Sequence, residues 1–502
     1  MKKKLIIIST NSIPVYLEKT SDDILAVSLS SINELNKHLI NFKTIKDFLD
    51  RKEILMFNKN FEKDFRKWVS DCDYLLEKQN SEKSCLPNAF WLMHRMLNYL
   101  FIIKLSKKIK EKYDVFDFIT HNKPSQSISI NDGISNLSFS TNENSLEGFI
   151  NTLYMTLNSK FLHIIKKDNL SHKFIYLYAK SILSRSFDIA KRRLSGKLLD
   201  FIFFFKSKKS RIGVLQKGYD VDFIINKYKD NDYIFFKDLI IKEIFHAKKE
   251  DSKLQIKVKK VSENFFLKWF SNIGFQLLDC YSTQITFLSI ISKEITKFSK
   301  INLEKYKVNS LLCSIGIQDQ VEYIFARECL KSSVTIHSFK HAGIESLFLD
   351  RSLLDPYLEK NIYPKRVQYV YSNLEKEFFK DKIEISTFVS GRLNLPKIKK
   401  NTYPKKRILY SMGPENFTSF KEMDRMLFDV ERFNLIKEIL SACSFYNQSL
   451  DIKMHPKGKI TQFETLESMK KQFSDKKIRI ILEGTIERIL YDYDLVIIDI
   501  LN

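Results

Sequence analysis

The sequence predicts an α/β protein with two Rossmann-like domains that face a cleft. Short apolar segments alternate with helical ones, most clearly from residue 309 onward, and no tight hairpin turn separates them. Such an alternation is typical of parallel sheets. The chain of 502 residues also exceeds what one hydrophobic core accommodates, because single cores stop growing near about 250–300 residues. More than one domain is therefore expected.

The N-terminal domain is expected over residues 1–395, and its first strand is the apolar run 5–8. That run ends at Ser9, too early for the apolar core of a signal peptide. A helix that is apolar on most sides spans 90–103, and a strand enters a loop over 117–122. Together these segments indicate a βαβ unit.

A helical insertion is expected over about 148–308, after a Ser- and Asn-rich loop at 124–147. It contains one weak strand signal at 233–236. The rest of the N-terminal domain returns to alternating strands and helices. Its strands are expected at 309–314, 334–336, 367–372 and 383–389.

The segment 396–406 is polar, basic and bracketed by prolines, which indicates a linker. The C-terminal domain is then expected over 407–502 and ends on an apolar strand, although a parallel strand needs helices over both sheet faces. Two explanations stay open: the last segment is not a strand, or the domain is a shortened member of its class. Its strands are expected at 407–411, 450–455, 478–482 and 495–498, and its helices at 426–443, 463–473 and 486–491.

The formal charge is +23, from 83 basic and 60 acidic residues. Such a charge attracts anionic partners such as nucleotide-activated substrates, anionic glycolipids, a bilayer surface or nucleic acid. A lysine-rich background composition of the source genome is the alternative explanation. The six cysteines are scattered and show no zinc-binding spacing, so no metal site is expected, and reduced thiols indicate the cytoplasm.

The strongest site signal is a strand that delivers Lys453 and His455 to its carboxyl end, with Lys457 in the loop beyond Pro456. Ligands bind at the carboxyl ends of strands in open α/β sheets. Two ammonium groups and an imidazole there can neutralise a phosphate or diphosphate. The alternative is a structural histidine near a strand end.

Two neighbouring strand ends add donor-binding candidates. Glu483 follows one strand and could accept hydrogen bonds from ribose hydroxyls, while Thr485 opens a helix whose free amides suit an anion. Gly413 lies in the loop after the first strand of this domain and could line a nucleotide pocket. An ordinary capped helix and a generic turn explain the same residues equally well.

The catalytic candidates lie in the N-terminal domain. His341 and Glu345 follow a strand, and Asp319 follows the strand before it, so any of them could take a proton from an acceptor hydroxyl. Glu322 is a further candidate base, and the residues do not rank these groups. Arg392 could clamp a phosphate at the hinge, or be a surface arginine in a turn.

The segment 191–209 places five apolar residues between basic flanks. Such a segment can lie in a membrane interface, and a buried helix end with solvated flanks is the alternative. No run approaches the ~18 apolar residues of a spanning helix, so any membrane contact is peripheral. The expected location is the cytoplasm, with peripheral contact at the inner face of the cell membrane.

Two loops and one hinge carry a family resemblance. Lys340-His341-Ala342-Gly343 resembles the glutamine-histidine-glycine loop of bacterial capsule and surface-polysaccharide glycosyltransferases of the GT-B type. Lys453-Met454-His455-Pro456 resembles their lysine-x-histidine-proline motif, which bacterial sialyltransferases, Kdo transferases and CDP-glycerol glycerophosphotransferases share. Val389-Ser390-Gly391-Arg392 is similar to the end of their N-terminal half. The resemblance covers about residues 308–499.

The resemblance implies metal-independent transfer from a nucleotide-activated donor, often a CMP-linked acidic sugar, with His455 at the donor phosphate. No cofactor is implied. The chain departs from the family pattern at Lys340 and Ala342, and it lacks the serine pair expected after the last strand, near Asp499.

The leading hypothesis is a glycosyltransferase whose acceptor is a surface polysaccharide or glycolipid. One alternative is glycerophosphotransfer from CDP-glycerol, and the other is a non-catalytic basic scaffold for membranes or nucleic acid. Nucleic acid is not expected as a partner, because aromatic residues are not interleaved with the basic ones.

Overall fold

The computed structural model describes most of the chain and divides its strands among three sheets, here called A, B and C. Every strand pair in them is parallel, so the expected α/β class with parallel sheets is confirmed. The described residues are 3–121, 149–158, 211–236, 252–270, 274–313, 320–339, 366–390, 407–412, 429–454, 460–473, 477–483 and 486–498, without 80, 82, 87, 151–152, 155, 216–218, 230, 371, 374–375 and 378–384.

Sheet A has the order β2-β1-β3 and lies between two hydrophobic cores. Along β1, Leu5 and Ile7 enter one core, whereas Ile6 and Ile8 enter the other, as the two-residue period of a strand requires. A strand buried on both faces has to be apolar throughout, which explains the unbroken run. The strands are β1 (Lys4–Ile8), β2 (Asp23–Ala26) and β3 (Val115–Ile119), with short 3-10 helices at Val15–Lys19 and Ile45–Asp47.

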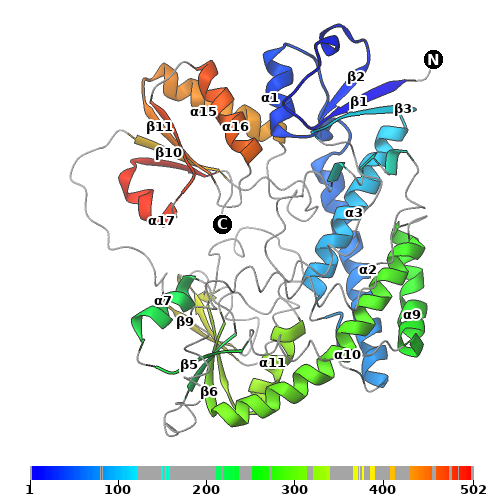
Figure 1. The fold of residues 1–502 in the computed structure, drawn as a ribbon, viewed down its shortest axis with the longest axis vertical. Helices are drawn as coiled ribbons and strands as arrows, with labels where there is room; N and C mark the ends of the chain where they lie inside the picture. Colours follow the sequence, from blue (N-terminus) through cyan, green and yellow to red (C-terminus); the bar gives the residue numbers. More distant parts are fainter. Residues whose placement is uncertain are drawn as a thin grey trace.

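The first core continues from sheet A through a helical layer to sheet B. The helices stand between the two sheets (Figure 1). Aromatic packing joins two of them, since the rings of Trp68 and Phe265 stack at 5.0 Å between centroids and Trp68 Nε1 donates to Ser262 Oγ. The layer consists of α2 (Arg51–Lys78), α3 (Ala89–Lys110), α9 (Ser252–Phe270) and α10 (Gly274–Tyr306).

Sheet B has the order β5-β4-β6-β7-β8-β9, in which the second strand lies outside the first and the others follow in sequence. This is the flavodoxin-like doubly wound order. The tract 148–308, expected as a helical insertion, therefore also supplies β4 and β5 to this sheet. Its elements are β4 (Arg211–Val214), α7 (Tyr219–Lys227), β5 (Tyr233–Phe235), β6 (Val308–Cys313), α11 (Gln320–Lys331), β7 (Thr335–Phe339), β8 (Arg366–Val370) and β9 (Ile385–Val389).

Sheet C has the order β12-β11-β10-β13. Numbered within this unit, that order is 3-2-1-4, the beginning of the Rossmann arrangement. All four strands expected in this part of the sequence are present, and β10 and β13 have the expected bounds. The elements are β10 (Arg407–Ser411), α15 (Asp429–Phe445), β11 (Ser449–Lys453), α16 (Ile460–Gln472), β12 (Ile478–Ile481), α17 (Ile486–Ile489), a 3-10 helix (Leu490–Asp492) and β13 (Leu495–Ile498).

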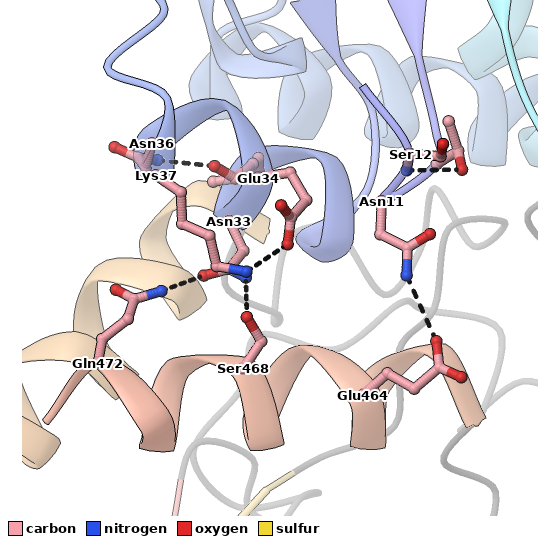
Figure 2. Close-up of polar contacts among 11 residues, drawn as sticks. Asn11, Ser12, Asn33, Glu34, Asn36, Lys37, Glu464, Ser468 and Gln472 are labelled. Atoms are coloured by element: carbon pink, nitrogen blue, oxygen red, sulfur yellow. Dashed lines mark hydrogen bonds and ion pairs between the residues drawn. The ribbon is translucent and has the colours of Figure 1, made fainter. Parts of the chain in front are cut away.

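Helix α1 (Leu29–Lys37) joins sheet A to sheet C, because it lies against α15 and α16 (Figure 1). Ser28 begins the helix by accepting a hydrogen bond from Ser31 N at 3.1 Å. Asn33 donates to Ser468 Oγ at 3.0 Å and accepts from Gln472 Nε2 at 3.3 Å (Figure 2). The N-terminal residues thus share a core with the last unit of the chain as well as with the helical layer.

No helix among the described residues is both long enough and apolar enough to cross a bilayer. The basic segment 191–209 lies outside the described residues, so its expected membrane contact stays a prediction. The same holds for the linker 396–406.

Candidate functional site at the carboxyl edge of sheet C

The strand order of sheet C selects one edge as the candidate site. Connections from β10 run toward β11 and β12 on one side, whereas β13 lies on the other side of β10. Ligands of doubly wound sheets bind outside the carboxyl ends of the strands at such a switch point. The carboxyl ends here are Ser411 of β10, Lys453 of β11, Ile481 of β12 and Ile498 of β13, which lie side by side in register.

Lys453 is the one basic side chain that these four strand ends carry, and it is 3 % exposed. Its Nζ donates to the carbonyl oxygen of Met454 at 2.9 Å and to that of Leu482 at 3.2 Å. The ammonium therefore ties the end of β11 to the end of β12. Of its three N–H donors, one is not used by these two bonds.

No carboxylate among the described residues forms an ion pair with Lys453. Burial lowers the pKa of its ammonium from the ordinary value of 10.5, because the charged form loses water without gaining a counterion. A buried cation held by carbonyl dipoles alone gains most from an anionic ligand.

Asp451 lies two residues before Lys453 and on the same face of β11, and its surroundings differ completely. Arg479 binds its carboxylate in bidentate form, with Nε to Oδ1 at 3.1 Å and Nη2 to Oδ2 at 2.7 Å. Arg407 Nη2 and the hydroxyl of Tyr493 also donate to Oδ2. Burial alone would raise the pKa of Asp451, but the bonds from Arg479, Tyr493 and Arg407 outweigh it and lower that pKa.

Sequence reasoning did not find the Asp451 network. Asp451 lies directly opposite Arg479 in the register of β11 and β12. A single charged residue inside the apolar strand Ser449–Lys453 was the available signal, since a buried carboxylate needs partners. The network holds the strands together away from the carboxyl edge and leaves that edge to Lys453.

Of the other donor-site candidates, the structure describes Glu483. It is exposed and directly follows Leu482, whose carbonyl oxygen accepts from Lys453. The structure thus brings the Lys453 ammonium to the backbone beside Glu483. Gly413, His455, Lys457 and Thr485 lie outside the described residues. Met412 and Met454, which directly precede Gly413 and His455, are buried just after β10 and β11.

Of the candidates in the N-terminal half, Asp319, His341, Glu345 and Arg392 also lie outside the described residues, whereas Glu322 lies in the first turn of α11. In the described part of that half, His337 packs against Tyr369. Its ring stacks on Tyr369 at 5.9 Å between centroids, and its Nδ1 lies 3.1 Å from the Tyr369 hydroxyl. Burial lowers the pKa of His337. Within the described ranges, no group of three or more His, Cys, Asp or Glu side chains is arranged to hold a metal ion.

Comparison with known proteins gives only remote structural likenesses. No family model matches the chain, and no curated protein matches it. Staphylococcus aureus MnaA in complex with UDP has a TM-score of 0.32 at 11% identity, over 58% of this chain and 74% of that chain. The UDP-GlcNAc 2-epimerase of Methanocaldococcus jannaschii gives 0.31 at 13%, over 58% and 79%. The Neisseria meningitidis UDP-GlcNAc 2-epimerase bound to UDP-GlcNAc gives 0.31 at 11%, over 58% and 69%.

Proposed function

We propose that this protein is a glycosyltransferase that binds a nucleotide-activated sugar at the carboxyl edge of sheet C. The observation that carries the proposal is the buried Lys453 ammonium, which has carbonyl partners but no described carboxylate and lies next to the switch point of a Rossmann-type strand order. The phosphates of a nucleotide sugar supply the charge that this cation lacks.

In the proposed complex, the third N–H of Lys453 donates to a donor phosphate. His455 and Lys457, which follow on the same strand end, add a directional donor and a second cation. Glu483 accepts hydrogen bonds from ribose hydroxyls, while Gly413 and Thr485 border the nucleotide. Arg392 would complete the phosphate clamp from the hinge.

The proposed reaction is displacement at the anomeric carbon. A hydroxyl of a surface polysaccharide or glycolipid forms the new bond to that carbon, and the bond from the carbon to the donor phosphate breaks. The nucleotide leaves with the electron pair, and one of His341, Glu345 or Asp319 takes the hydroxyl proton. Cations at the phosphate stabilise the developing negative charge, which makes electrostatics and orientation the main contributions to the rate.

The proposal is tested by thermal shift against CMP, CDP, UDP and GDP, because a ligand that binds only the native state raises the melting temperature. At least one nucleotide should stabilise the wild type, and Lys453→Met and His455→Ala should each lose that response. Lys477→Met is the matched control, since Lys477 lies just before β12 at the opposite edge of the sheet and binds Asn447 there.

The result against the proposal is equal stabilisation of wild type and Lys453→Met, or no response to any nucleotide. Transfer assays with isotope-labelled donors then examine the chemistry. Transfer of glycerol phosphate from CDP-glycerol, with no sugar transferred from any nucleotide sugar, would replace glycosyl transfer with glycerophosphotransfer at the same edge.

A further inference from the structure

The outer surface of α2 and α9 is a continuous two-helix face. The helices pack side by side, and two exposed lysines of α9 cross the seam between them. Lys257 Nζ donates to Oε1 of Gln79, the residue directly after α2, and Lys268 Nζ donates to Asp64 Oδ2 of α2. The solvent-exposed residues of both helices therefore border one another along the seam, and they are called the lysine face below.

The lysine face is strongly basic. Its α2 stripe includes Lys59, Lys63 and Lys67 at intervals of four residues, which places them on one side of the helix. Exposed acidic residues on the two helices are Asp71, Glu77 and Glu263. Against these three stand nine exposed lysines: Lys52, Lys59, Lys63, Lys67, Lys78, Lys253, Lys257, Lys260 and Lys268.

Much of this charge has no internal counterion. Lys67 pairs with Asp71 and Lys268 with Asp64. By contrast, Lys63, Lys253 and Lys260 form no ion pair with any described residue. Cations that are neither neutralised nor needed for packing are free to meet an external anion.

Apolar side chains project among these lysines. Ile256 is 66 % exposed and Tyr74 is 69 % exposed, and Val261 is exposed next to Lys260. Exposure of an isoleucine or valine side chain to water is energetically unfavourable. On a helix whose other side is buried in a core, the combination of outward lysines and outward apolar residues is typical of a surface that lies on the headgroup region of a bilayer.

We propose that the lysine face docks the protein on an anionic membrane surface. Lysines would bind lipid phosphates, and Ile256, Val261 and Tyr74 would enter the boundary with the acyl chains. A single-stranded nucleic acid fits less well, because such ligands need exposed rings to stack on. Tyr74 is the one exposed ring among the described residues of these two helices, whereas Trp68, Phe265 and Phe266 are buried, so the face offers no series of rings for successive bases. This docking is independent of the proposed transfer reaction.

The test is vesicle co-sedimentation of the full chain. Wild type should bind vesicles that contain phosphatidylglycerol and release on addition of salt, and it should not bind vesicles of phosphatidylcholine alone. The variant Lys63→Gln, Lys253→Gln, Lys260→Gln removes three unpaired cations. At about fivefold per lysine, vesicle affinity should fall about a hundredfold.

The matched control is Lys229→Gln, Lys437→Gln, Lys471→Gln, which makes the same change in net charge on exposed residues of other units. It should bind like wild type, and thermal unfolding of both variants should match wild type. Equal loss of binding in the two variants would show attraction by net charge alone and overturn the proposal. Binding to neutral vesicles, or absence of binding to anionic ones, would overturn it too.

Discussion

Asp451 and Lys453 are two buried charges on the same face of one strand, and their surroundings are opposites. Asp451 has a bidentate arginine, a second arginine and a tyrosine hydroxyl. Lys453 has two backbone carbonyl oxygens. A buried charge with full pairing cannot lose one partner without destabilising the fold, whereas a buried charge without a counterion costs stability and is typical of a site where a ligand supplies the missing charge. This difference in pairing distinguishes the structural network around Asp451 from the candidate binding site at Lys453.

The largest expected effect on stability comes from Asp451→Ala. The substitution leaves Arg407, Arg479 and the Tyr493 hydroxyl without their common acceptor, and loss of one partner from a buried charge network costs about 3 kcal/mol. Urea denaturation should show this loss in the free energy of unfolding. A loss below that of an ordinary surface substitution would contradict a structural role for Asp451.

The acid limb of stability should also depend on Asp451. Its pKa is lowered from 3.8 in the folded state, so its contribution is complete above pH 3.8 and is lost as the pH falls through the lower folded value. Asp73 acts in the opposite direction, because burial raises its pKa to about 6 and its protonation stabilises the fold as the pH falls below that value.

The difference in unfolding free energy between wild type and Asp451→Asn isolates the contribution of Asp451 to the pH dependence of stability. It should shrink as the pH is lowered below 3.8 and stay constant between pH 5 and 7, where Asp73 titrates equally in both proteins. A difference that persists unchanged at the lowest pH would argue against charge pairing of Asp451.

A smaller effect is expected from Arg479→Gln. The Arg479 side chain is 61 % exposed, so water screens its ion pair, and Arg407 and Tyr493 still bind Asp451. The free energy of unfolding should fall by no more than about 1 kcal/mol. A loss as large as that of Asp451→Ala would mean that the network depends on one pair.

The smallest change in stability is expected from Lys453→Met. Removal of the ammonium relieves the burial of an uncompensated charge and takes one donor from each of two carbonyl groups, so the two effects offset within about 1 kcal/mol. Urea denaturation of wild type and variant checks this. A large loss in the free energy of unfolding would show that Lys453 is a structural residue like Asp451, and the two buried charges would then have the same role.

Local pattern was sufficient to predict the strands of sheet C. The segments Arg407–Ser411 and Leu495–Ile498 are short, largely apolar and bounded by polar residues, so their bounds could be read from the sequence. Strand β4 could not be found in this way. It has four residues, and Gly213 is in it because a Cβ there would lie 2.9 Å from the Phe236 ring and 3.0 Å from Leu311.

The packing of helices and strands that are far apart in the chain could not be predicted from the sequence. The apolar run of β1 predicts a buried strand, but nothing in it says that α1 would pack on α15 and α16 more than 390 positions later. Likewise, Lys453 and Glu483 were predicted from motif and strand-end position, whereas the pairing of Asp451 with Arg479 depends on a register between two strands. The sequence of a strand indicates which residues lie on each of its two faces. It does not indicate which strand pairs with it or in which register.

The most direct test of the contrast is calorimetric titration of the stabilising nucleotide into wild type, Asp451→Asn and Lys453→Met. Wild type and Asp451→Asn should bind with similar affinity. Lys453→Met should bind about ten- to a hundredfold more weakly, as expected for loss of one charge-assisted hydrogen bond. Equal affinity in wild type and Lys453→Met would contradict an anion site at the carboxyl edge of sheet C.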